Sequence, residues 1–371
     1  MTNQDLLQIA EEFGTPVYVY DADSIKSQYE KLTTSFAEST KFFYACKSLT
    51  NINILKYVEK LGANLDCVSI NEVKLGLKAG FSAERILFTP NCVDLAEIEE
   101  AMALNVHINI DNISILEQFG TKYGDSYPVF LRINPHIFAG GNYKISTGHI
   151  DSKFGISIHQ MRHIERVMKS TNLNIEGLHM HTGSEIKDPE VFLQGLEIMF
   201  ELSESFPNLK YIDMGSGFKV PYQKGELETD VKALGKKVEK AVAQFKKETG
   251  KDFELWFEPG KYLVSKSGHF LVKSNVIKQT TATVFVGVNS GFNHLIRPMF
   301  YDSYHVIENL TNPKGTERIY TVVGNICETD TFAWDRKLHE VREGDILVFR
   351  NAGAYGFEMS SNFNSRLKPA E

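Results

Sequence analysis

Residues 41–69 read KFFYACKSLTNINILKYVEKLGANLDCVS, and this stretch decides the predicted fold. Its two ends, KFFYACK (41–47) and NLDCVS (64–69), are short runs of apolar, aromatic and small residues of the kind found in buried strands. Between them, NINILKYVEKLG carries apolar residues at helical spacing. The stretch therefore predicts a strand, a helix and a second strand, the unit from which parallel sheets are built.

The same alternation continues to about residue 260, with helical patterns such as NEVKLGLKAG and DLAEIEEAMALN in most of the gaps. Eight strands that alternate with helices over about 220 residues fit a (β/α)8 barrel of the TIM type. An open doubly wound sheet is the alternative, but eight consecutive units favour closure. The six further strands are expected near 85–89, 107–111, 127–134, 174–181, 209–214 and 253–258.

The two ends of the chain have a different pattern. TPVYVYD (15–21) predicts a short strand, and the chain after residue 262 is rich in β-branched and aromatic runs separated by turn signals. We therefore expect a C-terminal all-β domain, a sandwich or barrel that also takes up the N-terminal strand. The predicted division is a barrel domain over 25–262 and a β domain made of 1–24 together with 263–371.

Composition argues against several classes of partner. The 371 residues carry a formal net charge of −7 and no basic run, which disfavours nucleic acid and anionic membranes. No apolar run approaches the ~20 residues of a membrane span, and MTNQDLLQIAEEFG is typical of an amphipathic helix, not of a signal peptide. The four cysteines show no CxxC spacing, so we expect neither a zinc ribbon nor a disulfide framework. Such cysteine usage fits a reducing compartment, and we therefore expect a cytoplasmic protein.

Polar residues stand where the expected strands end, which is where (β/α)8 enzymes carry their active sites. In FFYACK, the alternation of a strand puts Phe43, Ala45 and Lys47 on one face. If that face points into the barrel, the desolvated lysine would have a depressed pKa and become a nucleophile toward carbonyls, as a Schiff base requires. A surface lysine at the strand exit is the alternative. The residues expected at or just after the carboxyl ends of the eight strands are Lys47, Ser69, Asn91, Asp111, Asn134, His181, Gly215 and Glu258.

Two motifs near the later strands suggest a ligand for that lysine. DMGSGF follows the seventh strand, and the N–H groups of a turn containing Gly215 and Gly217 can approach a phosphate closely. GLHMHTGSE places His179 and His181 on one strand face. A metal site would need further ligands at other strand ends. We therefore expect His181 to stack on a planar cofactor and His179 to be a core histidine.

A third motif, WFEPGK, puts Glu258 at the end of the eighth strand. A carboxylate buried there needs a cationic or hydrogen-bonding partner, and a protonated pyridine nitrogen would be one. An amine, a phosphate turn, a stacking ring and a carboxylate are together what pyridoxal phosphate requires.

A longer series of motifs carries a resemblance to a known family. In order they are YACKS, DCVSINE, STGHIDSKFGI, GLHMHTGSE, DMGSGF, EPGK, IRPMFYDSYH, NICETDTFAWDR and GAYGFEMSSNFNSR. With them the chain resembles, over nearly its whole length, the fold-type III pyridoxal-phosphate-dependent decarboxylases, which have an alanine racemase-like barrel. The likeness is strongest to the branch that acts on diaminopimelate. It implies a lyase that converts meso-2,6-diaminopimelate to L-lysine and CO2, the last step of lysine biosynthesis, as a homodimer with shared active sites.

The resemblance also implies roles for individual residues. Lys47, which bonds to pyridoxal 5'-phosphate, and Cys327, the proton donor, are the catalytic residues, and no metal takes part. The loop around Thr147 and Gly148 covers the site, and Cys327 and Glu328 come from the second subunit. Substrate contacts are implied for Lys261, Arg297, Tyr301, Glu328 and Tyr355. Cofactor contacts are implied for Lys47, His181, Ser184, Gly215, Ser216, Gly217, Glu258, Pro259, Gly260, Lys261 and Tyr355.

The predicted substrate depends on a few residues near its far end. Diaminopimelate carries a carboxylate and an amine at its far end, for which Arg297 and Glu328 are candidate partners. Relatives that act on ornithine generally have Asp after the catalytic cysteine, where this chain has Glu328. The usual EPGR is EPGK here, so Lys261 keeps the charge but loses the bidentate fork, and Ser216 interrupts the usual triple glycine. A decarboxylase of ornithine, lysine or arginine, a racemase on the same cofactor, and a non-catalytic relative remain alternatives.

Overall fold

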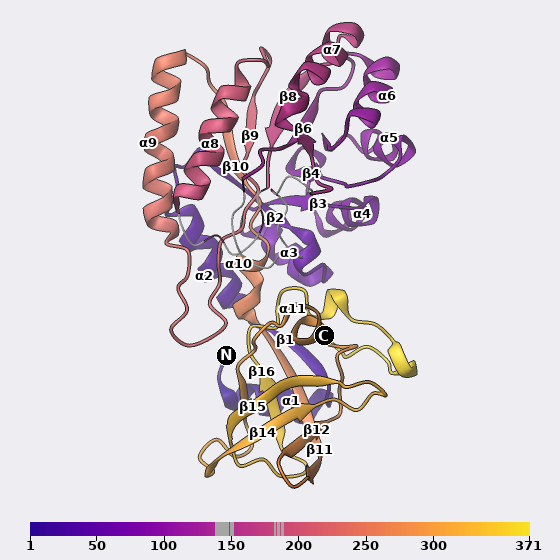
Figure 1. The fold of residues 1–371 in the computed structure, drawn as a ribbon, viewed down its shortest axis with the longest axis vertical. Coiled ribbons are helices and arrows are strands. Elements are labelled where there is room, and N and C mark those ends of the chain that lie inside the picture. Colours follow the sequence, from indigo (N-terminus) through magenta and orange to yellow (C-terminus); the bar gives the residue numbers. More distant parts are fainter. Residues whose placement is uncertain (138–147, 149–151, 182, 184–185, 187–188) are drawn as a thin grey trace. The chain divides into compact units, whose positions relative to one another are not determined.

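The computed structural model describes residues 1–371 except 138–147, 149–151, 182, 184–185 and 187–188 (Figure 1). The chain forms two compact units. One, here called the barrel unit, comprises Lys26–Val220 and Leu227–Tyr262. The other, here called the β unit, comprises Met1–Ile25, Pro221–Glu226 and Leu263–Glu371.

The barrel unit is built on eight parallel strands that close into a cylinder. The order runs β5-β4-β3-β2-β10-β9-β8-β6, and β5 also pairs with β6, which closes the ring. A two-residue strand, β7, pairs with the end of β6. The predicted (β/α)8 barrel is therefore confirmed. The strands are β2 (Lys41–Ala45), β3 (Asn64–Cys67), β4 (Ile86–Phe88), β5 (His107–Ile110), β6 (Val129–Asn134), β7 (Ile156–Ser157), β8 (Ile175–His179), β9 (Tyr211–Asp213) and β10 (Glu254–Phe257).

Helices lie outside this ring of strands (Figure 1). Several begin at a side chain that accepts a hydrogen bond from the first turn, which satisfies an otherwise unpaired N–H group. Ser69, Asp94, Asn112 and Asp230 cap four helices in this way. The helices are α2 (Ala22–Thr33), α3 (Ile52–Lys60), α4 (Ile70–Ala79), α5 (Leu95–Ala103), α6 (Ile113–Tyr123), α7 (Met161–Thr171), α8 (Pro189–Ser203), α9 (Val231–Thr249) and α10 (Lys261–Val264).

An apolar cluster fills one level of the barrel interior. Phe43, Leu87, Phe130 and Trp256 are buried against one another, each from a different strand. Gly177 makes room for this packing, because a Cβ there would lie 2.1 Å from Cδ1 of Phe130. Since inward positions recur every second residue, the next inward positions after Leu87, Phe130 and Trp256 carry polar side chains, namely Thr89, Arg132 and Glu258.

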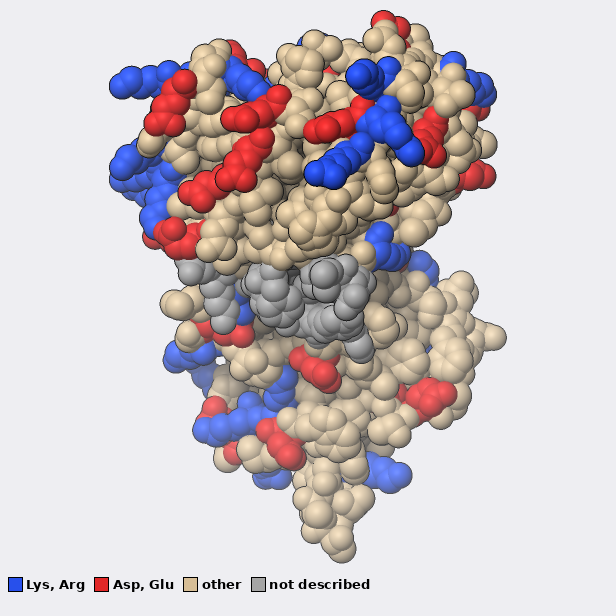
Figure 2. Space-filling view, turned by 45° about the horizontal axis from the view of Figure 1, so that its top comes forward, with Lys and Arg blue, Asp and Glu red and all other residues tan. Residues whose placement is uncertain are grey.

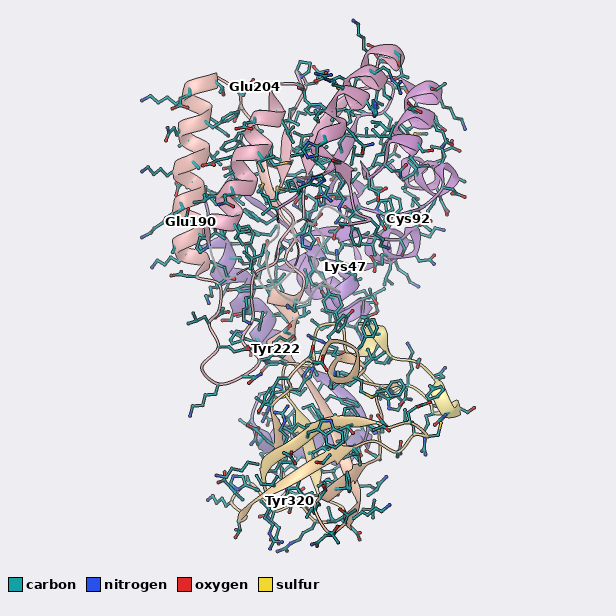
Figure 3. All side chains as sticks on the ribbon, in the orientation of Figure 1. Lys47, Cys92, Glu190, Glu204, Tyr222 and Tyr320 are labelled. Atoms are coloured by element: carbon teal, nitrogen blue, oxygen red, sulfur yellow. The ribbon has the colours of Figure 1, made fainter. Side chains whose placement is uncertain are left out.

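The β unit is a mixed sheet of seven strands. Its order is β13-β16-β11-β12-β14-β15, and β1 pairs antiparallel with β11, so the predicted uptake of the N-terminal strand is confirmed. Buried aromatic and aliphatic side chains form its core, including Tyr18, Phe270 and Tyr320, of which Tyr320 is labelled in Figure 3. The strands are β1 (Val17–Tyr20), β11 (Gly268–Gln279), β12 (Val284–Val288), β13 (Ile307–Asn309), β14 (Glu317–Val323), β15 (Thr331–His339) and β16 (Ile346–Phe349).

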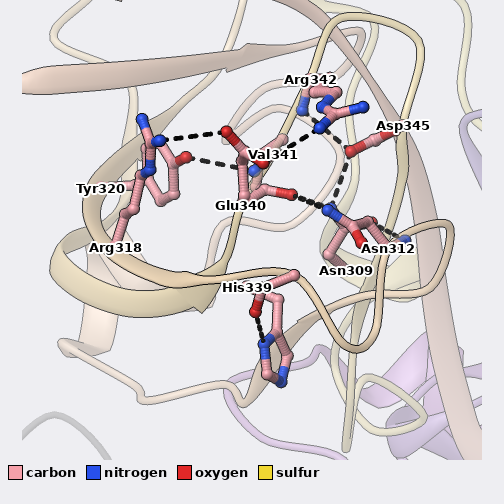
Figure 4. Close-up of polar contacts among 10 residues, drawn as sticks. Asn309, Asn312, Arg318, Tyr320, His339, Glu340, Val341, Arg342 and Asp345 are labelled. Carbon is pink, nitrogen blue, oxygen red and sulfur yellow. Dashed lines mark hydrogen bonds and ion pairs between the residues drawn. The ribbon is translucent and has the colours of Figure 1, made fainter.

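Helix α1 (Asn3–Phe13) also belongs to the β unit, as the amphipathic N-terminal pattern predicts. Thr2 and Asp5 form a capping box at its start, and Leu6 and Ala10 pack on β1, β11 and β16. A network of hydrogen bonds connects the segment after β13 with the segment after β15 (Figure 4). There the Glu340 carbonyl accepts the side-chain amides of Asn309 and Asn312 at 2.9 and 3.0 Å.

Charged side chains of both signs are intermingled on the face drawn in Figure 2, and its described residues form no large patch of one sign. None of the helices in the described part of the chain combines the length and the hydropathy that a membrane-crossing segment needs. The four cysteines are free thiols, with Cys46 and Cys67 buried and Cys92 and Cys327 exposed.

Candidate active site

Lys47 lies at the end of β2, in a position that corrects one prediction. The strand stops at Ala45, and Lys47 lies in a 3₁₀ turn, Cys46–Ser48. The strict alternation expected from Phe43 to Lys47 therefore breaks before the lysine. The Lys47 side chain in Figure 3 is 38% exposed, so it is not stripped of water as the sequence suggested.

The amine of Lys47 has a buried acidic partner. Its Nζ lies 2.9 Å from Oδ2 of Asp66, whose side chain is 0% exposed. Burial raises the pKa of Asp66, the charge of Glu258 raises it further, and the Lys47 charge lowers it. Because Asp66 comes from the neighbouring strand β3, the pair fixes the amine over the end of the barrel. No sequence motif predicts a role for Asp66.

Glu258 follows β10 directly and is buried two residues after Trp256. Its Oε2 lies 3.2 Å from Nε2 of His179. Burial alone would raise the pKa of Glu258, but the charge and hydrogen bond of His179, with Lys47 and His181 nearby, lower it to about 2. Its other oxygen, Oε1, has no hydrogen-bond partner among the described residues. Glu258 is therefore a buried anion that can accept one more hydrogen bond.

His181 lies against the glycine turn that follows β9. The N–H of Ser216 donates to Nδ1 of His181 at 3.2 Å. Burial, and then the charges of Arg132 and Lys47, lower the pKa of His181 to about 3. The imidazole is therefore neutral at physiological pH, with Nδ1 as an acceptor, which suits a ring that stacks on a flat partner.

The turn itself needs glycine at both flanking positions. Gly215 and Gly217 have φ of +61° and +124°, a region that side chains disfavour. A Cβ on Gly215 would lie 2.6 Å from Nδ1 of His181, and one on Gly217 would lie 2.4 Å from the Gly183 carbonyl oxygen. Ser184, a predicted phosphate contact, lies outside the described residues, as does Thr147.

A layer of buried polar side chains surrounds these groups inside the barrel. Besides Asp66, it contains Arg132 on β6, His179 on β8 and Asp213 on β9. Arg132 is buried and faces the charges of Glu258, Asp111, Asp66 and Asp213. The sequence motifs predict a chemical role for none of these residues. The available signal was their position, since each lies at the last residue of a strand or one or two residues before it.

The turn after Glu258 packs on the end of β2. The Pro259 carbonyl accepts the Ala45 N–H at 3.3 Å, and a Cβ on Gly260 would lie 2.9 Å from Cβ of Ala45. Gly260 thus permits the close approach that places Glu258 and Lys47 at the same end of the barrel. Lys261 begins α10.

The remaining predicted residues belong to the β unit. Arg297 starts α11 (Arg297–Tyr301) and is buried, with its guanidinium 4.9 Å from the ring centre of Tyr222. Its Nη1 donates to the Tyr222 hydroxyl at 2.8 Å and to the Ala354 carbonyl at 3.1 Å. Tyr301 ends that helix, and Tyr355 has a positive φ of 56°.

Cys327 is exposed in the β unit and is held by Asn364. The Cys327 N–H donates to Oδ1 of Asn364 at 2.8 Å, and Nδ2 of Asn364 donates to the thiol sulfur at 3.1 Å. Glu328, next to it, is also exposed. The amide therefore fixes the orientation of a thiol that has solvent in front of it.

The barrel-unit residues fit pyridoxal phosphate on structural grounds. The orphaned Oε1 of buried Glu258 matches a protonated pyridine nitrogen, which has one hydrogen to donate. The turn at Gly215 and Gly217 has no room for a Cβ, so its backbone can approach a phosphate closely. Lys47 supplies the amine and His181 a neutral ring.

Comparison with known proteins agrees with this geometry. Residues 22–265 match the family model described as pyridoxal-dependent decarboxylase, pyridoxal binding domain. The chain is 36% identical to the diaminopimelate decarboxylase of Methanothermobacter thermautotrophicus over 99% of this chain and 88% of that protein. It is 33% identical to the diaminopimelate decarboxylase of Escherichia coli strain K12, over 99% of this chain and 90% of that one.

Solved structures give the same result. A crystal structure of diaminopimelate decarboxylase from Helicobacter pylori complexed with L-lysine superposes with a TM-score of 0.90 at 30% identity, covering 99% of this chain and 93% of that one. A lysine/ornithine decarboxylase from Vibrio vulnificus, at 22% identity and a TM-score of 0.87, covers 99% and 96% and shares the fold. The chain belongs to the diaminopimelate decarboxylase family of pyridoxal-dependent decarboxylases.

Proposed function

We propose that the protein decarboxylates meso-2,6-diaminopimelate to L-lysine and CO2 with pyridoxal 5'-phosphate as cofactor. The observation that carries the proposal is the presence, at one end of the barrel, of the Lys47 amine, held by Asp66, and of a buried anionic carboxylate, Glu258, that keeps one oxygen without a partner among the described residues. Relatives named diaminopimelate decarboxylase cover nearly the whole chain, and one of their structures contains L-lysine, the product expected here.

In this proposal the barrel unit binds and orients the cofactor. When bound, pyridoxal phosphate supplies an electron sink for the electron pair that CO2 leaves on the substrate carbon. Lys47 would hold the cofactor covalently, and Asp66 orients its amine. Glu258 would keep the proton on the ring nitrogen because a buried anion stabilises the adjacent cation. The Gly215–Gly217 turn would bind the phosphate, with Ser216, Ser184 and Lys261 as further proposed contacts.

Residues of the β unit would act on the substrate. Cys327 would deliver the proton to the carbon that has lost CO2, with its thiol oriented by Asn364. Arg297 and Glu328 would pair with the carboxylate and the ammonium at the far end of diaminopimelate, since each charge needs a partner once it leaves water. Tyr301 and Tyr355 are the remaining proposed contacts.

We further propose that the active enzyme is a homodimer in which Cys327 and Glu328 serve the partner's site. The support is an exposed apolar surface near these residues. Met299 and Trp334 are 42% and 62% exposed and line, together with Thr329, a pocket of about 360 Å³. Large apolar side chains exposed together are typical of surfaces that another chain covers.

Two organisational proposals complete this picture. The barrel domain over 25–262 and the β domain of 1–24 with 263–371 are proposed as the functional divisions of the chain. A cytoplasmic location is proposed because a free thiol at Cys327 persists in a reducing compartment.

The experiment that tests the function compares CO2 release from meso-diaminopimelate, ornithine, lysine and arginine by the purified holoenzyme. We expect the highest kcat/KM with meso-diaminopimelate. A higher value with any of the other three would overturn the substrate while leaving the family assignment intact. Because the far-end carboxylate is what separates diaminopimelate from lysine, Arg297→Met should lower kcat/KM for diaminopimelate more than for lysine.

A further inference from the structure

Three buried titratable residues form a cluster that the proposed chemistry uses only in part. His179, Asp213 and Glu258 come from β8, β9 and the end of β10, three neighbouring strands, and His179 pairs in register with Asp213. All three side chains are buried, and one ligand atom from each lies within 4.8 Å of one from each of the others. Two carboxyl groups therefore share a small, water-poor space with one imidazole.

The free oxygens of the two acids raise the question of where a proton lies. Oδ1 of Asp213 accepts the Gly215 N–H at 2.8 Å, and Oε2 of Glu258 faces His179 at 3.2 Å. The other two oxygens, Oδ2 of Asp213 and Oε1 of Glu258, have no partner among the described residues. Two ionised carboxylates can only accept hydrogen bonds and they repel each other. Their contact becomes favourable when one of them is protonated and can donate a hydrogen bond.

The surrounding charges decide which acid keeps the proton. Glu258 has His179 in contact and Lys47 and His181 nearby, and the pKa of Glu258 is lowered to about 2. Burial raises the pKa of Asp213 well above its ordinary value, and the Glu258 charge raises it further. Lys47 is already paired with Asp66.

Two further charges face the cluster, and neither of them reverses this assignment. Arg132 on β6 faces Asp66, Asp111, Asp213 and Glu258 and so favours no single one of them. The negative charge of Asp66 raises the pKa of Asp213 as well.

We propose that Asp213 is a neutral carboxylic acid whose O–H is donated to the Glu258 carboxylate, and that Asp213 and His179 are positioning residues that fix Glu258 as the anion that pairs with the cofactor. A carboxylate offers about four acceptor sites, so Glu258 can accept from both residues and still accept from the ring nitrogen. Through its Oδ1 the same Asp213 anchors the phosphate turn at Gly215. One neutral acid thus links the two ends of the cofactor site. This inference rests on the proposed function because it assumes that Glu258 pairs with pyridoxal phosphate.

Infrared spectroscopy of the holoenzyme at neutral pH tests the protonation directly. A protonated carboxyl group has a C=O stretching band that a carboxylate lacks. We expect such a band in the wild-type protein, its loss in Asp213→Asn, and its retention in Asp252→Asn, a control in which the same change is made at an exposed acid paired with Lys246. A spectrum in which Asp213→Asn removes no band would overturn the proposal.

Cofactor affinity supplies a second readout, which needs no substrate. Asp213→Leu removes both the donor to Glu258 and the acceptor for Gly215, and we expect the dissociation constant of pyridoxal phosphate to rise about 10- to 100-fold, as for a lost hydrogen bond to a charged group. Asp213→Asn keeps a donor and an acceptor in the same places and should restore most of the affinity. If Asn is no better than Leu, the neutral-donor role is wrong. Failure of CO2 release by the wild-type enzyme would instead count against the proposed function, and the infrared result would still stand.

Discussion

At the scale of single residues, the site brings charged groups from different strands within hydrogen-bonding range of one another. Lys47 has Asp66 and Glu258 has His179, both at hydrogen-bonding range inside the barrel. A buried charge without a partner costs several kcal/mol, so these pairings explain why a barrel interior tolerates so many ionisable groups. The partner of the Lys47 amine, Asp66, is fully buried, which holds this amine at the end of the barrel.

The position of Lys47 leads to a labelling prediction. Borohydride reduction of the holoenzyme should attach the cofactor irreversibly to Lys47, because a lysine held beside an acid at the mouth of the barrel is the amine placed to bond the aldehyde. Peptide mass spectrometry after digestion measures this. Lys261, at the start of α10, is the control, and label on Lys261 in place of Lys47 would contradict the assignment.

At the scale of elements, much of the barrel could be predicted. All eight strands occur where the alternation predicts them, because buried parallel strands leave a strong apolar signal between helices. The turn into which β2 breaks could not be predicted, since Ala45 and Cys46 suit a strand and a 3₁₀ turn equally well. The layer containing Asp66 and Asp213 was also missed. A single acid inside an apolar run shows no pairing until the neighbouring strands are in register.

The glycine turn after β9 gives a prediction at this scale. Gly217→Ala would force a Cβ to 2.4 Å from the Gly183 carbonyl oxygen at a positive φ. We expect a loss of stability of about 1–3 kcal/mol, together with weaker binding of pyridoxal phosphate, because the turn must move. Thermal unfolding and a cofactor titration measure the two effects.

The matched control for that change is Gly225→Ala. Gly225 also has a positive φ, of +89°, but nothing lies within 4 Å of its Cβ position. Gly225→Ala should therefore lower the stability through backbone strain without weakening the binding of pyridoxal phosphate. Equal loss of affinity for pyridoxal phosphate in both variants would show that crowding at the Gly217 turn is not what weakens binding.

At the scale of the whole molecule, the predicted active-site residues fall in two separate units. Lys47 belongs to the barrel unit and Cys327 to the β unit. The sequence predicts both because their motifs are local, but whether one chain or two complete a site is a property of assembly that no local motif records.

A mixing experiment tests the shared site. Lys47→Ala and Cys327→Ala should each be nearly inactive as homodimers. If each site combines Lys47 of one chain with Cys327 of its partner, random exchange of subunits should restore about a quarter of the wild-type activity, because half of the dimers then carry one intact site. Activity that stays at the level of the separate variants, with subunit exchange verified, would show that each chain completes its own site.

Stability against pH provides a further test within the β unit. Burial lowers the pKa of His305 to about 3 and raises that of Asp330 to about 6. Below pH 6.5 the unfolded chain protonates His305 while the folded chain does not, so this histidine makes the protein lose stability as pH falls. Asp330 acts in the opposite direction, since below about pH 6 it takes up a proton in the folded state that the unfolded chain does not hold until about pH 4.

We therefore expect opposite effects from two substitutions. Between pH 6.5 and pH 5, the free energy of unfolding of His305→Asn should fall by about 2 kcal/mol less than that of the wild type. That of Asp330→Asn should fall by more than that of the wild type. Urea unfolding at both pH values, followed by a signal from the β unit, measures the difference. Parallel pH profiles for the two variants would contradict the assignment of these groups.

The pairing of β1 with β11 has a consequence for synthesis on the ribosome. Val17 of β1 pairs with Leu271 of β11, and every strand of the barrel lies between them in the chain. At about 5–20 residues per second, β1 waits on the order of 10–50 s for its partner, while the barrel strands emerge in the order in which they pair. The nascent chain therefore carries an unpaired apolar strand throughout translation of the barrel, which makes VYVY the segment for which a ribosome-associated chaperone is most useful.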